Sequence, residues 1–287
     1  MNSLDYTEVR QVGEDIHLIA MKHFNLDETL DCGQAFRYVK VGEGYEGIAH
    51  GRRISLEYLK ETLCPPGPIL VIKNTNIQDY STLWKNYFDL GRNYTKLKSF
   101  LIEHGGEPMR LATKYSPGLR HMKQEPWEVL ISFILSQHTN IPRIKLMLGR
   151  LCEKYGDKLM CGGYTFPSWE RLATLSLDDF GELKFGYRAP YVLDAARRIS
   201  EGKLNLEGIS NEETGKIREE LLKIHGVGPK VADCVLLLGF GKVEVCPKDV
   251  WIKRALEKFY PKGFPNGLAP YAGIAQQFLF HFVRNGV

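Results

Sequence analysis

The chain has 287 residues, of which 44% are hydrophobic and 25% charged, and its formal net charge is +4. These values are typical of a globular protein that can bury a core without disulfides or a structural metal, and they exclude extended disorder. No run of about 18 apolar residues occurs, so we expect no membrane-spanning helix. Residues 1–18 are polar and acidic where a signal peptide would be basic and then apolar. We therefore expect a protein of the cytosol or nucleus.

The six cysteines do not form a recognisable framework. They stand at positions 32, 64, 152, 161, 234 and 246, and no two are separated by two residues. The Cys-x-x-Cys spacing of zinc ribbons and thioredoxin-like motifs is therefore missing. In a reducing compartment we expect free thiols, mostly buried, and no metal site.

The N-terminal third of the sequence predicts an antiparallel sheet with one or two helices. Short segments rich in aromatic and β-branched residues, punctuated by Gly and Pro, predict strands at 33–41, 44–51, 52–59 and 68–74. Helices are expected at 77–90 and 94–106.

From about residue 108 the apolar residues follow helical periodicity. Glycine closes several of the expected helices, which span 125–139, 140–156, 176–183, 188–202, 211–226, 228–241, 248–259 and 269–286. The sequence thus predicts an α+β protein with an N-terminal antiparallel α+β domain at 1–107 and a helical domain at 108–287.

Positive charge is concentrated in one segment. Residues 108–155 contain eight basic and three acidic residues, a net charge of +5. A basic face of this size could meet phosphates, and a solvated helix surface explains the segment equally well.

The most specific signal lies between Leu221 and Leu256. Gly226, Val227 and Gly228 join two predicted helices. Glycines allow a tight turn and close approach of a ligand, and the unpaired N–H groups of the following helix lie at the positive end of its dipole. Such a turn suits a phosphodiester without reading base sequence. A tight structural connection is the simpler interpretation of the same turn.

Two ionisable residues near the glycine turn are candidates for a catalytic role. Lys230 is the second residue of the following helix, where a cation opposes the helix dipole. The dipole and the apolar neighbours disfavour its charged form, as a nucleophilic amine requires. Asp249 stands at the expected N-cap of the helix at 248–259. It is either only a cap or a carboxylate kept ionised by the dipole and directed at the same pocket as Lys230.

The glycine hairpin followed by lysine and then aspartate resembles the helix–hairpin–helix DNA glycosylase superfamily. Within it, GVGPKVADCVLLLGFGKVEVCPKDVW resembles the 8-oxoguanine DNA glycosylase/lyases. Similar stretches run from LDCGQAFRY through NYFDL, SFILSQHTNIPRI and FGYRAPYV to YAGIAQQFLF, so the resemblance covers nearly the whole chain. It implies an N-terminal antiparallel α+β domain followed by an all-α domain, with the helix–hairpin–helix at about 212–239.

The resemblance implies a pocket for 8-oxoguanine. The N7–H of the lesion, absent from guanine, would donate to the backbone carbonyl of Gly33. The flipped base would stack between Cys234 and Phe280, and Gln276 would bind its Watson–Crick edge. By themselves, Gly33 is a turn glycine, and Cys234 and Phe280 fit a core, whereas Gln276 on an apolar helix needs hydrogen-bond partners.

The resemblance also implies contacts with the rest of the duplex. Tyr187 would wedge into the base stack, and Arg143 and Arg188 would bind the base opposite the lesion. His138 stands where the family carries Asn, so we expect a different filling of the gap. Trp251 stands where the family carries His, which puts one phosphate contact in doubt.

The implied reaction is bifunctional. Lys230 attacks C1′ of the flipped nucleotide, Asp249 stabilises positive charge on the sugar, and the resulting Schiff base allows β-elimination, which nicks the strand. No metal or organic cofactor is required, although a monovalent cation could sit at the hairpin carbonyls. The expected partner of the monomer is double-stranded DNA containing oxidised guanine, in the nucleoid or, in a eukaryote, the nucleus.

Two alternatives stay open. A monofunctional alkylpurine-type DNA glycosylase would use water as nucleophile, and its members do not usually carry lysine at the position of Lys230. A non-catalytic helix–hairpin–helix DNA-binding protein would need neither Lys230 nor Asp249. The iron–sulfur branch of the superfamily requires four cysteines after the catalytic aspartate, and none follows Cys246.

Overall fold

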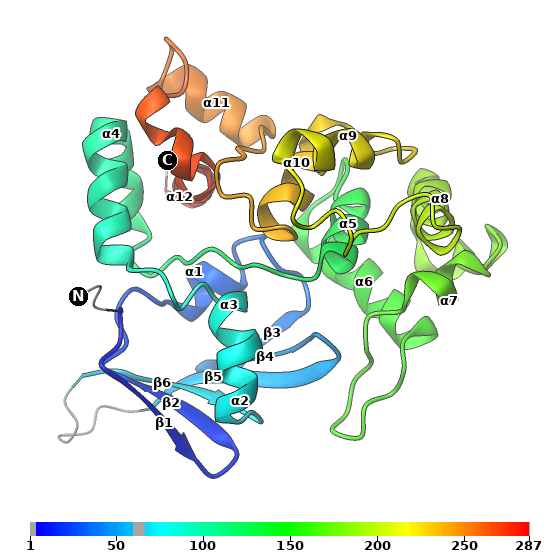
Figure 1. The fold of residues 1–287 in the computed structure, drawn as a ribbon, viewed down its shortest axis with the longest axis horizontal. Helices are drawn as coiled ribbons and strands as arrows, with labels where there is room; N and C mark the ends of the chain where they lie inside the picture. Colours follow the sequence, from blue (N-terminus) through cyan, green and yellow to red (C-terminus); the bar gives the residue numbers. More distant parts are fainter. Residues whose placement is uncertain (1–3, 60–66, 287) are drawn as a thin grey trace. The chain divides into compact units, whose positions relative to one another are not determined.

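The computed structural model describes residues 4–59 and 67–286. The described chain forms two compact units, which are coloured along the sequence in Figure 1. The first unit comprises residues 4–47, 54–59, 67–123 and 248–286. The second comprises residues 48–53 and 124–247. Both ends of the chain therefore contribute to the first unit.

An antiparallel sheet forms the N-terminal part of the fold, with strand order β1-β2-β6-β5-β4-β3 (Figure 1). Its strands are β1 (Glu8–Val12), β2 (Asp15–Ile19), β3 (Tyr38–Val41), β4 (Gly44–Ala49), β5 (Arg52–Leu59) and β6 (Ile69–Lys73). The apolar sequence ILVIK of β6 is buried on both faces, as expected for a central strand. The sheet and the helices that follow confirm the predicted α+β fold class.

Two strand predictions differ from the structure. The β1–β2 hairpin, which turns at Gly13 with φ of 62°, lies outside the expected strands. Edge strand β1 is largely exposed, so its sequence lacks a clear alternation of apolar and polar residues. The strand expected from residue 33 begins only at Tyr38, and residues 33–37 form a loop instead.

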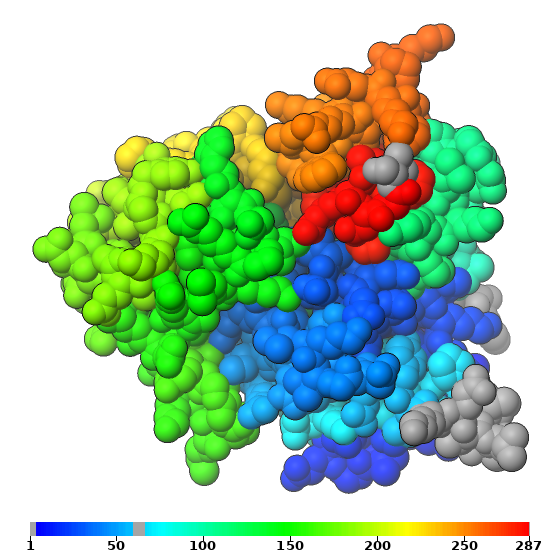
Figure 2. All heavy atoms as spheres, turned by 180° about the vertical axis from the view of Figure 1, so that it is seen from behind, coloured from blue at the N-terminus to red at the C-terminus, as the bar shows by residue number. Residues whose placement is uncertain are grey.

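The helices of the first unit come from two parts of the sequence. They are α1 (Leu26–Leu30), α2 (Ile77–Asp79), the π-helix η1 (Tyr80–Trp84), α3 (Lys85–Tyr87), α4 (Tyr94–Tyr115), α11 (Val250–Phe259), the 3-10 helix η4 (Asn266–Tyr271) and α12 (Ala272–Asn285). Helix α4 continues past residue 107 through a kink at Gly106, and it lies beside α12 (Figures 1 and 2). The units thus differ in extent from the expected ranges 1–107 and 108–287.

The second unit is helical, apart from the tip of the β4–β5 hairpin. Its helices are α5 (Pro126–Leu135), α6 (Ile141–Tyr155), α7 (Trp169–Ala173), the 3-10 helices η2 (Asp178–Leu183) and η3 (Gly186–Arg188), α8 (Ala189–Ser200), α9 (Thr214–Leu222) and α10 (Pro229–Leu238). Helix α5 is buried almost throughout and packs against α10, the helix that follows the glycine hairpin. Segment 176–183, expected to be α-helical, is mostly the 3-10 helix η2.

One of the eight basic residues of segment 108–155 lies in the core and not on a basic surface. Arg120 is fully buried, donates to Asp5 Oδ2 at 2.9 Å and lies 4.0 Å above the ring centroid of Tyr94. Residues 108–123 belong to the first unit and 124–155 to the second. Periodicity alone did not reveal this buried ion pair, because Asp5 lies far away in the sequence.

The cysteines within the described chain are free thiols, as expected. Cys32, Cys152 and Cys234 are buried, Cys246 is partly buried and Cys161 is exposed. Cys64 lies outside the described residues. Among the described helices, none has both the length and the apolar character needed to cross a membrane.

Candidate active site

The glycine turn between α9 and α10 has the conformation that its sequence predicts. Gly226 has a φ of 80°, and a Cβ there would collide with the ring of Tyr191. Position 226 therefore requires glycine for two independent reasons. The N–H of Val227 donates to the carbonyl of Ile224 at 3.0 Å, which closes the turn.

The start of α10 offers free backbone donors. Gly228 is the N-cap, has no side chain to cap the helix, and has open space where a Cβ would lie. The first intrahelical bond is donated by Ala232 to the carbonyl of Gly228 at 3.0 Å. The N–H groups of Lys230 and Val231 precede that bond, so they are available to an anion.

The side chain of Lys230 lies over an aromatic ring. Its Nζ is 4.8 Å from the ring centroid of Phe133 on α5, and the residue is partly buried. No ion pair holds Lys230 within the part of the chain that the structure describes. Cys234 is one turn further along α10 and is buried. An amine on an apolar base without a carboxylate partner is suited to approach an electrophile.

A second turn, after α5, brings three predicted DNA-binding residues together. His138 is exposed with a φ of 49°, and its ring lies 6.5 Å from that of Tyr187 in a T-shaped arrangement. Tyr187 is 50% exposed, whereas Arg188 is only 5% exposed. The Arg188 guanidinium lies 4.5 Å above the Tyr187 ring and donates to the carbonyls of Gln137, His138 and Phe185.

Arg188 therefore supports the turn that carries His138. Its expected contact with the base opposite the lesion stays a prediction. Arg143 is exposed in the first turn of α6, which Asn140 caps by accepting the Arg143 N–H at 3.0 Å.

In the first unit, Asp249 is the N-cap of α11. Its Oδ1 accepts the N–H of Ile252 at 2.8 Å, and its Oδ2 has no partner among the described residues. The capping interpretation and the functional one are therefore compatible, because one oxygen serves the helix and the other is free.

Two further predicted residues lie one turn apart on α12, which packs against α11. Gln276 is 4% exposed, and its Oε1 accepts from Nε2 of Gln277 at 2.8 Å. Phe280 is partly exposed, and the Arg284 guanidinium lies 5.8 Å from its ring centroid.

Gly33 lies in the loop between α1 and β3 with a φ of 95°. No donor within the described residues reaches its carbonyl. The buried neighbour Gln34 anchors the loop, because its Nε2 donates to the Arg120 carbonyl at 2.8 Å and its Oε1 accepts from the Met122 N–H at 3.1 Å. Burial raises the pKa of the adjacent Cys32 thiol. The sequence analysis did not predict that Gln34 anchors this loop. A polar residue next to a turn glycine is the feature that could have suggested it.

The predicted site residues are thus divided between the units. The second unit holds the hairpin residues, Lys230, Cys234, His138, Arg143, Tyr187 and Arg188. The first holds Gly33, Asp249, Gln276 and Phe280. Within each unit the structure places the residues on neighbouring elements, with Gly33 on a separate loop. Sequence reasoning also missed Gln137, whose side chain donates to the Gly226 carbonyl at 3.1 Å.

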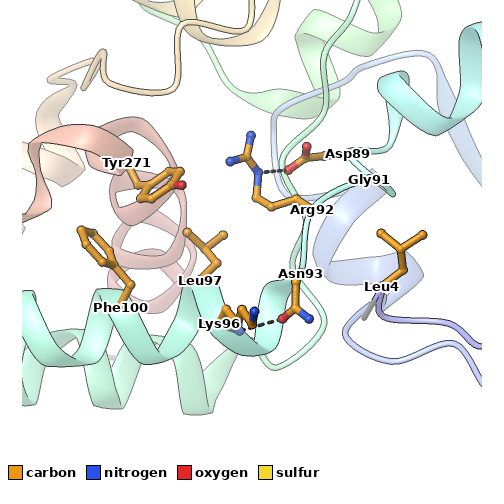
Figure 3. A pocket seen from close by; sticks show the side chains of 9 residues that line it. All are labelled: Leu4, Asp89, Gly91, Arg92, Asn93, Lys96, Leu97, Phe100 and Tyr271. Carbon is orange, nitrogen blue, oxygen red and sulfur yellow. Dashed lines mark hydrogen bonds and ion pairs between the residues drawn. The ribbon is translucent and has the colours of Figure 1, made fainter. Parts of the chain in front are cut away.

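A separate cavity of about 570 Å³ occurs in the first unit (Figure 3). Its lining includes Arg92, whose Nε donates to Asp89 at 2.6 Å and whose guanidinium lies 5.4 Å from the ring centroid of Tyr271. None of the predicted site residues lines it.

Two family models match consecutive parts of the chain. The 8-oxoguanine DNA glycosylase N-terminal domain matches residues 17–130, and the HhH-GPD superfamily of base excision DNA repair proteins matches residues 131–263. The N-glycosylase/DNA lyase of Saccharomyces cerevisiae is 37% identical over 163 residues, which are 51% of this chain and 43% of the yeast protein. The chain thus spans less than half of that relative's length.

Two solved structures match over nearly their whole length. The Clostridium acetobutylicum 8-oxoguanine glycosylase/lyase, in complex with dsDNA containing cytosine opposite 8-oxoG, is 32% identical with a TM-score of 0.89, covering 98% of this chain and 99% of that one. MBOgg1, in complex with a low affinity DNA ligand, is 36% identical with a TM-score of 0.89, covering 96% and 98%. With both family models matched and these structures aligned over almost every residue, the chain belongs to the 8-oxoguanine DNA glycosylase/lyase family of helix–hairpin–helix base-excision proteins.

Proposed function

We propose that this chain removes 8-oxoguanine from duplex DNA and then nicks the strand at the same site. One observation carries the proposal beyond family membership. Lys230 lies in the first turn of α10, directly after the glycine turn, over the ring of Phe133 and without a carboxylate partner. A lysine needed only for charge would be better placed at the other end of the helix, where the dipole favours cations.

In the proposed reaction the duplex is bound by its phosphates and the damaged nucleotide leaves the stack. The free N–H groups at the start of α10 hold a phosphate. Tyr187 and His138 occupy the gap, and Arg143 and Arg188 bind the base opposite the lesion. In the pocket, the Gly33 carbonyl accepts the lesion's N7–H, Gln276 binds its Watson–Crick edge, and Cys234 and Phe280 stack on its faces.

The neutral amine of Lys230 forms a bond to C1′ while the C1′–N9 bond breaks, and the base leaves with the electron pair and takes a proton. Asp249, through its free oxygen, stabilises positive charge on the sugar. Loss of the amine proton and opening of the sugar give a Schiff base. Loss of a C2′ proton from the imine expels the 3′ phosphate and nicks the strand.

Borohydride trapping tests this proposal directly, because reduction of a Schiff base joins protein and DNA covalently. Wild-type protein on duplex containing 8-oxoguanine is expected to give a covalent adduct. Lys230→Gln is expected to give no adduct, no base release and no nick, with near-normal lesion binding. Lys216→Gln, an exposed lysine of α9 paired with Glu212, is the matched control and is expected to behave as wild type.

The outcomes also separate the alternatives. Base release without an adduct would replace the imine mechanism with the water-using, monofunctional one. Duplex binding with neither base release nor adduct would support a non-catalytic DNA-binding protein.

We propose in addition that the enzyme acts as a monomer in the nucleoid or nucleus. No metal or organic cofactor enters the proposed reaction. A monovalent cation bound by the hairpin carbonyls would act only by ordering the phosphate-binding turn.

A further inference from the structure

Gln137 joins two turns that the proposed function assigns to DNA. We propose that Gln137 is a positioning residue that couples the phosphate-binding turn at Gly226–Gly228 to the turn that presents His138 and Tyr187. The inference rests on the proposed function, because that function gives each turn its role. It concerns the second unit alone.

The side chain of Gln137 binds the hairpin. Its Nε2 donates to the carbonyl of Gly226 at 3.1 Å and to that of Ile134, in the last turn of α5, at 3.1 Å. Both donors of the amide group are thereby used. They tie the glycine turn to the end of buried helix α5, and Gln137 itself precedes Gly226 by 89 residues.

The backbone of Gln137 binds the other turn. Its carbonyl accepts from Nε of Arg188 at 2.9 Å, from a second guanidinium nitrogen of Arg188, and from the hydroxyl of Tyr187 at 3.3 Å. Arg188 also donates to the His138 carbonyl at 3.3 Å. One residue therefore holds the hairpin with its side chain and the exposed aromatic pair with its carbonyl.

Two residues of α8, Tyr191 and Asp194, support the two turns independently of Gln137. The ring of Tyr191 on α8 packs against Gly226 and lies 6.0 Å from the ring of Tyr187. Asp194 Oδ2 accepts the N–H of His225 at 2.8 Å. Because the contacts of Tyr191 and Asp194 remain, loss of the Gln137 amide is expected to loosen the two turns without unfolding the unit.

Coupling follows from this geometry. A phosphate that orders the Gly226–Gly228 turn also orders the Gln137 amide, and through the Gln137 carbonyl it orders Arg188 and Tyr187. Binding at the hairpin and insertion of Tyr187 then support each other, whereas in the absence of the amide each would act separately.

The test uses two duplexes, one intact and one with a stable abasic-site analogue that needs no chemistry. Three variants at positions 136 and 137 are compared first, followed by Tyr187→Ala alone and combined with Gln137→Met. Gln137→Met keeps the length of the side chain and removes its donors. Gln137→Glu keeps the shape but turns a carboxylate towards two carbonyls. Ser136→Ala is the matched control, because it removes a 2.8 Å side-chain bond to Phe133 in the same turn without touching the hairpin.

The expected order of affinity for both duplexes is wild type and Ser136→Ala, then Gln137→Met, then Gln137→Glu. Gln137→Met is expected to bind about 3- to 10-fold more weakly, as loss of one or two positioned hydrogen bonds implies. Tyr187→Ala is expected to weaken binding to the abasic duplex at least about 3-fold less in the Gln137→Met background than in wild type. This non-additivity is the signature of coupling.

Two results would overturn the proposal: Gln137→Glu binding as wild type, or independent effects of Gln137→Met and Tyr187→Ala. A lower melting temperature with unchanged affinities would make Gln137 a structural residue only. The proposed function is tested separately by excision of 8-oxoguanine by the wild-type protein, so absence of excision with coupled binding would remove the function and leave the coupling.

Discussion

Asp249 caps helix α11 in the structure, and the proposed reaction gives the same side chain a catalytic role. Asp249→Asn and Asp249→Ser keep an oxygen that can accept the Ile252 N–H, so the melting temperature is expected to stay near wild type. Loss of the negative charge is expected to slow base release about 100-fold, or about 3 kcal/mol of barrier. Single-turnover excision and thermal unfolding check the two roles. A lower melting temperature with an unchanged rate would reduce Asp249 to a cap.

His121 predicts a dependence of stability on pH. Neither ring nitrogen has a partner among the described residues, and burial lowers the pKa of His121 to about 4. The unfolded chain binds this proton near pH 6.5 and the folded chain only near pH 4, so stability is full above pH 6.5 and is lost as pH falls towards 4. The loss is about 3 kcal/mol at most, at 1.36 kcal/mol per pH unit.

His121→Leu is expected to remove this part of the acid sensitivity, because leucine fills the site without a titrating group. Urea unfolding at pH 7 and pH 5 measures it, with His104→Gln as an exposed control expected to change nothing. Equal pH dependence in the wild type and His121→Leu would show that His121 does not titrate between those values.

At the scale of the element, substitutions at the two hairpin glycines are expected to affect different properties, stability at Gly226 and DNA binding at Gly228. Gly226→Ala places a side chain at φ of 80° against the Tyr191 ring, so it is expected to lower the free energy of unfolding by more than about 1 kcal/mol. Gly228→Ala meets no atom within 4 Å and is expected to change stability by less than about 1 kcal/mol.

For Gly228→Ala we expect weaker DNA binding without a large loss of stability, in contrast to Gly226→Ala. The methyl group of Gly228→Ala lies beside the free N–H groups of α10 and is expected to weaken binding of any duplex, damaged or not, while the protein remains folded. Urea unfolding and fluorescence anisotropy with both duplexes make the comparison. Wild-type affinity for Gly228→Ala would remove the start of α10 from the DNA-binding surface.

At the scale of the molecule, we expect the affinity for duplex DNA and the recognition of 8-oxoguanine to depend on different residues. Phosphate contacts predict that log affinity falls linearly with log salt, with a slope on the order of −3 to −6, equally for damaged and undamaged duplex. Buried Arg120 is excluded from these contacts. Phe280→Ala is expected to weaken lesion processing by roughly 1–3 kcal/mol through lost stacking, and Gln276→Ala through a lost edge contact.

Neither pocket variant is expected to change the salt slope or the affinity for undamaged duplex. Binding isotherms at several salt concentrations, together with excision rates, test this division. If Phe280→Ala excises 8-oxoguanine as fast as wild type, Phe280 is a core residue and the pocket lies elsewhere.

Features that depend only on neighbouring residues could be predicted from the amino-acid sequence. The glycine turn, Pro229 at the start of α10, and the Asp249 cap of α11 are local, since each is governed by backbone conformation and bonds within a few residues. The α+β order of the elements follows from periodicities of the same short range. The candidate residues Lys230 and Asp249 could be proposed because each stands at a position that such local rules define.

Contacts between side chains that are far apart in the sequence depend on how the whole chain packs. Arg120 became an internal partner of Asp5, and helix α4 ran through the expected boundary at residue 107 because α12 packs against it. Gln137 reaches Gly226 across 89 residues. No local pattern encodes such pairs, because a buried polar group must be satisfied by whatever partner packing brings within about 3 Å, and that partner is set by the fold as a whole.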